Sequence, residues 1–319
     1  MKRLMDFLWP VIGLAAVGFA FYLLYQELRG LSANDIVASL KAIPASHYAL
    51  AALSTLVAYA ALAWYDRIAL LHLDRKLGWV FISVVSFTTY ALSHNIGASV
   101  FSGAMVRYRA YSTRGLSAAE VGVLVALCSF TFGLGTVLLG GLVLVARPGI
   151  VRRLYDIPIW AAQGIGVALL AFVALYIFGS LRHFAPQTVA GFKLVYPRPP
   201  IALRQLAAAP VELIGAAGII FFALPEASNP GYFVVLGVFL ASFSAALLSH
   251  APGGLGVLEF IFLKAMPDAP KADVVAALIV FRLFYLLIPL GFAIVMVIVF
   301  ERGRLNEAVR ARLKGKGGI

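Results

Sequence analysis

Charged side chains inside otherwise apolar stretches are the residues of this sequence whose types are best suited to chemistry. Glu259 follows a glycine-rich segment, and Arg282 lies inside the last long apolar run. Charged groups within a bilayer are costly unless they are paired or face water. A guanidinium group binds phosphate through two parallel hydrogen bonds. We therefore predict that Glu259 and Arg282 face each other in an outward-open cavity and bind a zwitterionic or anionic headgroup. The alternative is an ion pair that only holds the fold together.

Two further arginines and one further acid are candidate substrate-binding residues. Arg107 and Arg109 flank Tyr108 at the expected inner mouth of the protein, where they would contact phosphate. Their alternative role is the ordinary positive charge of a cytoplasmic loop. Glu212 is a deep acid within an apolar run. It would line a central cavity, serve a proton-coupling step, or form a hydrogen bond to a neighbouring helix.

Two histidines complete the candidate set, and Ser249 directly precedes the second of them. His94 and His250 would change charge near neutral pH, although each precedes a helix break and is better suited to bracing it. They are too few and too far apart in the sequence to indicate a metal site, and we predict no cofactor. The Ser-His neighbours do not indicate a hydrolase, because adjacency does not create a nucleophile and base geometry and no G-x-S-x-G motif is present.

The segment 249–259 interrupts an apolar run that resumes immediately afterwards. It contains four residues that break or loosen a helix, which are Pro252, Gly253, Gly254 and Gly256. Irregular backbone within a bilayer persists only where protein or a water-filled cavity shields it. The segment therefore indicates a substrate site, and a loop at the membrane surface is the alternative.

A second break occurs near Gly97, where the segment 91–97 also carries Leu-Ser-His before the end of an apolar run. The two breaks lie nearly half the chain length apart, and long apolar stretches follow both. Paired interrupted segments in two halves are typical of transporters with internal repeats. We predict one membrane domain with two inverted-topology repeats, 1–158 and 159–301. Each repeat would contain a broken re-entrant hairpin, at 80–106 and 232–266.

Composition and charge indicate an all-α polytopic integral membrane protein. The chain of 319 residues is 62% hydrophobic and 13% charged, and its net charge is +12. Several apolar runs, among them 7–25 and 48–65, approach the ~20 residues that a membrane-spanning helix needs. We expect connectors over 27–47 and 182–204 and a basic loop over 66–76, with Asp66 near the membrane surface. Most lysines and arginines fall on alternate loops and in a basic tail, 302–319, so the positive-inside rule predicts that both termini are cytoplasmic. The expected location is the cytoplasmic (inner) membrane of a bacterium.

Three motifs resemble the transmembrane region of lysylphosphatidylglycerol synthetases, the multiple peptide resistance factor family. They are Ala-Leu-Ser-His-Asn-Ile-Gly at 91–97 with Val-Arg-Tyr-Arg-Ala-Tyr-Ser at 106–112, Pro-Gly-Gly-Leu-Gly at 252–256, and the arginine of Ile-Val-Phe-Arg-Leu-Phe-Tyr at 279–285. The resemblance covers about residues 10–300. It implies lipid handling by a flippase-like domain. The sequence ends 19 residues after Phe300, without the synthetases' transferase domain, so lysyl transfer is not implied.

The sequence thus favours a transporter that moves a phospholipid or lipid-linked headgroup between leaflets. Its partners would be anionic or aminoacylated phospholipids. We do not expect an enzyme. The alternative is a membrane subunit of a headgroup-modifying enzyme that works with a separate transferase. An ion channel fits less well, because two closed hairpins leave no continuous pore. Nucleic-acid binding is not expected, since only charge supports it. A glycine-rich apolar stretch, 133–141, is compatible with a homodimer.

Overall fold

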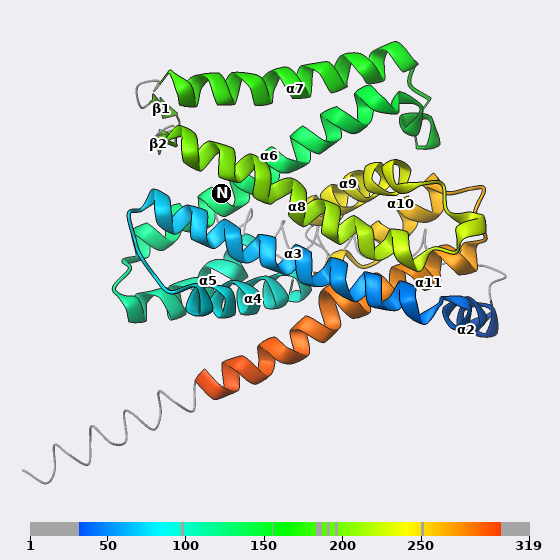
Figure 1. Cartoon of the computed structure of the whole chain (residues 1–319), viewed down its shortest axis with the longest axis horizontal. Helices are drawn as coiled ribbons and strands as arrows, with labels where there is room; N and C mark the ends of the chain where they lie inside the picture. The colour runs from blue at the N-terminus through cyan, green and yellow to red at the C-terminus, as the bar shows by residue number, and fades with distance from the viewer. Residues whose placement is uncertain are drawn as a thin grey trace, which may run out of the picture.

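The computed structural model describes residues 32–96, 99–154, 156–182, 187–189, 192–194, 197–249 and 252–300. These residues are almost entirely helical (Figure 1). The helices are α2 (Ala33–Ala42), α3 (Ala45–His72), α4 (Trp79–Ile96), α5 (Ser99–Tyr111), α6 (Ala118–Ala146), α7 (Ile159–Leu181), α8 (Pro199–Ala223), α9 (Tyr232–Leu248), α10 (Val257–Ala265) and α11 (Lys271–Phe281). After α11 the helix continues through a π-helical turn, Arg282–Leu287, and then as α-helix over 288–300.

Five of the described helices are long and apolar enough to cross a membrane. They are α3, α6, α7, α8 and the continuous helix Lys271–Phe300. The predicted class, an all-α multi-pass membrane protein, agrees with this finding. The expected first span at 7–25 and the basic tail 302–319 lie outside the described residues.

Local sequence signals explain where the helices begin. Ser117 accepts a hydrogen bond from the backbone of Glu120 at 3.3 Å, and the Glu120 carboxylate accepts one from the Ser117 backbone at 2.8 Å. This reciprocal capping box starts α6 at the expected position. Ser32 and Asp35 start α2 in the same way, within a connector where no helix was predicted.

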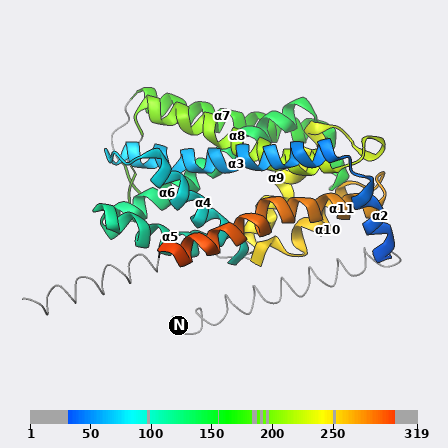
Figure 2. The same cartoon turned by 60° about the horizontal axis from the view of Figure 1, so that its bottom comes forward.

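The centre of the molecule is the contact between α3 and α8, which lie along each other in both views (Figures 1 and 2). Glycines bring the two backbones close together. A Cβ atom at Gly215 would lie 2.9 Å from the carbonyl oxygen of Ser54. Close approach at small residues is the usual way in which membrane helices pack, since lipid supplies no hydrophobic driving force between them.

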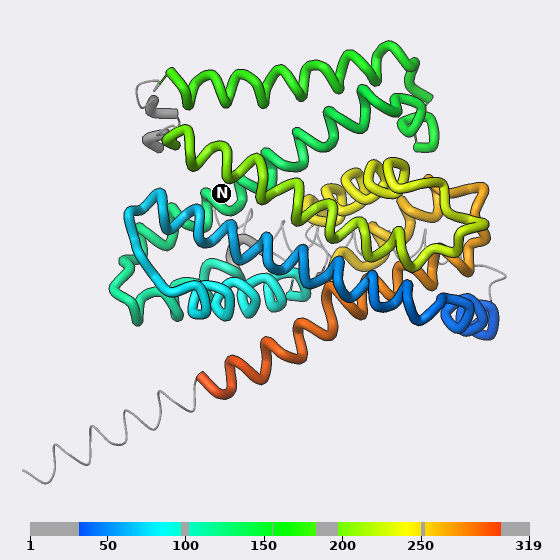
Figure 3. Tube along the Cα trace, viewed as in Figure 1, coloured from blue at the N-terminus to red at the C-terminus, as the bar shows by residue number. Residues whose placement is uncertain are grey.

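The short helices form two pairs at the two ends of the α3–α8 contact. Helices α4 and α5 pack on each other, and so do α9 and α10 (Figure 3). Helix α7 lies at one edge of the molecule, and the continuation of α11 lies at the opposite edge (Figure 1). Helix α7 packs mainly on α6 and α8. Both pairs are thus attached to one central scaffold.

Three expectations about the helices need correction. The connector expected over 182–204 is shorter, because α8 begins at Pro199 and a two-stranded hairpin, β1 (Gln187–Val189) with β2 (Phe192–Leu194), precedes it. The second span does not end at Tyr65 but continues to His72. The glycine-rich stretch 133–141 was expected to permit close packing between two copies of the protein. Gly135 instead lies against Ala209 of α8 and Gly141 against Leu170 of α7, so these two glycines serve packing within the chain, whereas a Cβ atom at Gly133 would meet nothing within 4 Å.

Candidate functional site

Glu259 and Arg282 face each other, as predicted. The Arg282 guanidinium contacts Glu259 Oε1 through Nε and Nη2, and its Nη1 donates to the carbonyl oxygen of Gly253 at 2.9 Å. Glu259 Oε2 accepts a hydrogen bond from the Gly256 backbone at 2.9 Å. The Arg282 side chain is 18% exposed and the Glu259 side chain is 12% exposed. Arg282 therefore binds both the carboxylate at the start of α10 and the backbone of the break before it.

The break itself depends on glycine conformations. Gly253, Gly254 and Gly256 have φ angles of +59°, +62° and +80°, which side chains rarely adopt. A short 3₁₀ turn, η4 (Pro252–Gly254), lies between α9 and α10. These residues therefore interrupt the helix where the sequence predicted. Ser249 ends α9 and donates from Oγ to the carbonyl oxygen of Ala246 at 2.7 Å.

Arg107 was expected at the inner mouth of the protein, but it lies in a buried cluster. Its Nη2 contacts Asp66 Oδ1 at 2.7 Å, and its Nε donates to Oδ2 at 3.2 Å. The Tyr111 hydroxyl donates to the same Oδ2 at 2.8 Å, and the Arg107 guanidinium lies 4.7 Å from the centre of the Tyr90 ring. Arg107 is 4% exposed and Asp66 is fully buried. The expectation that Asp66 belongs to a membrane-surface loop is therefore wrong, because α3 extends beyond it.

Arg109, two positions further along α5, is exposed. Neighbouring residues of an α-helix point in different directions, so two arginines at this spacing do not share a face. The structure therefore separates the two arginines that the sequence analysis had grouped. Only Arg109 retains a surface position compatible with phosphate contact.

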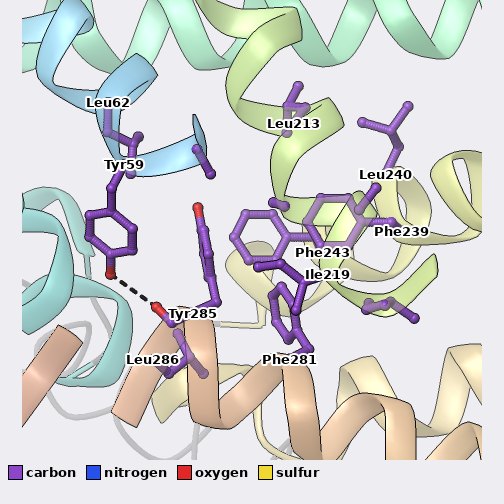
Figure 4. Packing of buried hydrophobic residues seen from close by; sticks show 14 of the residues in the cluster. Tyr59, Leu62, Leu213, Ile219, Phe239, Leu240, Phe243, Phe281, Tyr285 and Leu286 are labelled. Atoms are coloured by element: carbon purple, nitrogen blue, oxygen red, sulfur yellow. Dashed lines mark hydrogen bonds between the residues drawn. The ribbon is translucent and has the colours of Figure 1, made fainter. Parts of the chain in front are cut away.

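Glu212 is buried at the junction of α3, α8 and the π-helical turn, with 1% of its surface exposed. The hydroxyls of Tyr65 and Tyr285 donate to its two oxygens at 3.3 and 2.7 Å. Tyr59 of α3 donates to the carbonyl oxygen of Tyr285 at 2.9 Å (Figure 4). Of the three roles considered for Glu212, the hydrogen bond between helices is therefore present.

His94 lies at the end of α4 within an aromatic cluster. Its ring stacks on Tyr285 with centroids 5.4 Å apart, and it also packs against Tyr90 and Phe243. The neighbouring Asn95 donates to the carbonyl oxygen of Leu286 at 3.1 Å. The end of α4 also contacts η4, so the chain just before the first break lies against the second one. These contacts favour the bracing role for His94. His250 and Gly97 lie outside the described residues.

Two polar features of the structure were not predicted. The π-helical turn contains one extra residue per turn, which releases backbone carbonyls such as those of Tyr285 and Leu286 to accept hydrogen bonds from other helices. Gln205 of α8 is fully buried and joins Tyr176 of α7 at 2.6 Å to Thr131 of α6 at 2.8 Å. A glutamine within an apolar run was the available signal for the second feature.

Within the described ranges, no group of three histidine, cysteine or acidic side chains is arranged to hold a metal ion. The side chains that converge at the two breaks are instead an arginine, a carboxylate, a histidine and tyrosines. Side chains of these types can bind ions and hydrogen-bonding groups.

The long apolar helices, with charged side chains buried between them, define a multi-pass membrane protein. The chain is 32% identical over 269 residues to "Inner membrane protein YbhN" of Escherichia coli (strain K12), covering 82% of this chain and 81% of the relative. It is 30% identical over 298 residues to "Uncharacterized protein slr0712" of Synechocystis, covering 90% and 91%. The protein therefore belongs to the family of these two bacterial proteins, and the name of the Escherichia coli relative together with the five apolar helices supports a multi-pass inner-membrane location.

A more distant similarity extends over nearly the whole chain. "Phosphatidylglycerol lysyltransferase" of Bacillus subtilis (strain 168) is 23% identical over 320 residues, covering 98% of this chain but only 36% of the relative. This agrees with the resemblance to the membrane region of lysylphosphatidylglycerol synthetases. No protein-family model matches the chain.

Proposed function

We propose that the protein moves the headgroup of an anionic or aminoacylated phospholipid between the leaflets of the bacterial inner membrane. The observation that carries this proposal is the position of Arg282 at the second break. Its guanidinium binds Glu259 and a backbone carbonyl, which are ligands that a lipid phosphate can replace. The name of the lysyltransferase relative adds a substrate class, because that protein acts on phosphatidylglycerol.

Inverted repeats would give such a protein two alternating cavities. The order of elements supports them: α3, α4, α5 and α6 match α8, α9, α10 and Lys271–Phe300 in sequence order and approximate length. Opposite orientation of the two halves, with both termini cytoplasmic, rests on the distribution of lysine and arginine. The repeat boundaries 1–158 and 159–301 follow from the same correspondence.

Re-entrant hairpins would provide the polar route. Helix α5 has 13 residues and α10 has 9, which at ~1.5 Å per residue is too short for a hydrocarbon core of ~30 Å. Each is paired with a longer helix across a break. A carboxylate–arginine contact holds the first pair to α3, and another holds the second pair to the last helix, Lys271–Phe300. The headgroup would pass along these breaks while the acyl chains stay in lipid.

The second candidate function is a membrane subunit of an enzyme that modifies lipid headgroups with a separate transferase. The similarity to a lysyltransferase favours it. On this reading we propose that the separate transferase carries out the chemical step. Co-purification of a transferase with the native protein would distinguish the two functions.

The test is a leaflet assay in proteoliposomes. Purified protein is reconstituted with tail-labelled phosphatidylglycerol, phosphatidylethanolamine or a cationic aminoacyl lipid, and a membrane-impermeant reductant destroys the outer-leaflet dye. Loss of more than the outer-leaflet half of the signal, absent in Arg282→Ala, is the expected result. Protein-free vesicles and the surface variant Arg75→Ala are controls, since Arg75 forms an exposed ion pair with Glu120. Protection of half the dye for every lipid would overturn the proposal.

A further inference from the structure

Among the described residues, Glu212 is a buried carboxyl group that takes part in no ion pair. Its two oxygens instead accept hydrogen bonds from the hydroxyls of Tyr65 and Tyr285. The other fully buried carboxylate of the described residues, Asp66, binds Arg107, and the half-buried Glu259 at the second break binds Arg282. Removing a lone carboxylate from water costs several kcal/mol, so this group differs in kind from the other two.

The surroundings of Glu212 leave a proton as the simplest way to neutralise it. The titratable groups that face it are Tyr59 and Tyr65 from α3 and Tyr285 from the π-helical turn. No charged side chain of the described parts of α6, α7, α9 or α11 interacts with it. A carboxylate at the centre of a membrane domain, surrounded by neutral hydroxyls, is an arrangement found in proton pathways.

Protonation of Glu212 would change the hydrogen bonds around it. A carboxylate only accepts hydrogen bonds, and here it accepts one from each tyrosine. A protonated carboxyl group gains a hydrogen to donate, and its hydroxyl oxygen is a weaker acceptor than a carboxylate oxygen, so the tyrosine contact at that oxygen weakens or reverses. Tyr285 belongs to the same π-helical turn as Arg282, which holds the second break. The protonation state of Glu212 is thereby linked to the position of the proposed lipid-binding arginine.

From this geometry we infer that Glu212 binds and releases a proton in each transport cycle, which makes the proton a co-substrate. The inference rests on the proposed lipid movement. In the step itself, water or hydronium from one side delivers a proton to the carboxylate, and the same proton leaves to the other side. No other bond is made or broken. His94 stacks on Tyr285, which donates a hydrogen bond to Glu212.

The experiment measures leaflet asymmetry under an imposed pH gradient. A protein that is not coupled to protons only equalises a labelled lipid between leaflets. A gradient of one pH unit supplies a ratio of about tenfold to a step that moves one proton. Wild-type proteoliposomes should therefore build a lasting asymmetry of the labelled lipid, up to about tenfold, that collapses when a protonophore is added.

Glu212→Gln should abolish the asymmetry, because the amide has a similar shape but takes up no proton. Glu226→Gln is the matched control, since Glu226 is exposed in the turn after α8, and it should keep the asymmetry. Wild-type protein that moves lipid but only equalises the leaflets would overturn the coupling and leave the proposed function intact. A Glu212→Gln variant that retains the asymmetry would overturn it as well.

A second measurement does not depend on transport. Infrared difference spectra recorded across a pH titration should contain the carbonyl band of a protonated carboxylic acid that is absent in Glu212→Gln and present in Glu226→Gln. Such a band supports the proton site even if no lipid moves in the leaflet assay, which would overturn only the proposed function. A wild-type spectrum in which no band depends on Glu212 overturns the proton site itself.

Discussion

Arg107 and Asp66 form a buried ion pair with two contacts. The pair joins α5, the short helix of the first helix pair, to the central helix α3. Glu259 and Arg282 join the second helix pair to the last helix with the opposite arrangement of charges. In the first half the arginine lies on the short helix, and in the second half the carboxylate does. Each pair thus fixes a short, interrupted helix that could not span a membrane alone.

Removing one partner of the buried pair should destabilise the protein strongly. We expect Asp66→Asn to lower the free energy of unfolding by about 3–5 kcal/mol, because it leaves Arg107 charged and uncompensated in the interior. Asp74→Asn is the matched control, since Asp74 forms an exposed contact with Arg198 at 3.8 Å and the change should cost under about 1 kcal/mol. Thermal unfolding in detergent measures both. Equal stability of the two variants would contradict the structural role of the pair.

The two arginines of α5 should respond differently to charge reversal. Arg107→Glu places two carboxylates in one buried site and should prevent recovery of folded protein. Arg109→Glu affects an exposed position and should preserve the fold. If Arg109 contacts headgroups, its variant should bind anionic lipid nanodiscs more weakly at low salt, and the difference should shrink at high salt because exposed charges are screened. An unchanged titration would remove Arg109 from the site.

A pair of neutral substitutions separates the two roles of Arg282. If the ion pair with Glu259 only holds the fold, the double variant Glu259→Gln with Arg282→Gln should translocate lipid better than either single variant, because no charge is left alone. If Arg282 binds the headgroup, the double variant should remain inactive while its thermal stability exceeds that of the single variants. Leaflet assays on matched amounts of folded protein make the comparison.

Close packing of α3 and α8 should depend on Gly215. Its Cβ atom would meet backbone atoms of Ser54 and Ala58 at 2.9 and 3.0 Å, so Gly215→Ala should force the helices apart at a cost of about 1–3 kcal/mol. Gly133→Ala is the matched control, because no described atom lies within 4 Å of the added carbon. That change should be neutral or stabilise α6 by up to about 1 kcal/mol. Thermal unfolding that ranks the two variants the other way would contradict the packing described.

Apolar runs and helix-breaking residues sufficed to predict most helices. The glycines at 253, 254 and 256 can break a helix by their own backbone freedom, and Ser117 with Glu120 caps α6 through local hydrogen bonds. The pairing of Glu259 with Arg282 also followed, because the sequence offered few other partners for either charge. All of these signals lie within one segment or rest on the cost of burying charge.

The features that escaped prediction depend on contacts between distant segments. Asp66 looked like a loop residue because it stands at the end of an apolar run beside Arg67. It is buried by contacts with other helices, which include Arg107 of α5 and Cys128 of α6. The tyrosines around Glu212 come from residues 65 and 285, which no local pattern connects. The start of α8 at Pro199 was missed because four prolines precede or begin it, although proline is well tolerated in a first helical turn.

The π-helical turn at Arg282–Leu287 also sets the rotational orientation of the helical segment that follows it. One residue of an α-helix corresponds to a rotation of about 100°. The extra residue therefore turns the face of 288–300 relative to the face of Lys271–Phe281, and the last helix presents two different sides to its surroundings. Deleting one residue within this turn would restore a regular helix and rotate the segment 288–300 by the same angle. The final span therefore turns a different side toward lipid before and after the π-helical turn, and the change falls at Arg282, the residue that binds Glu259.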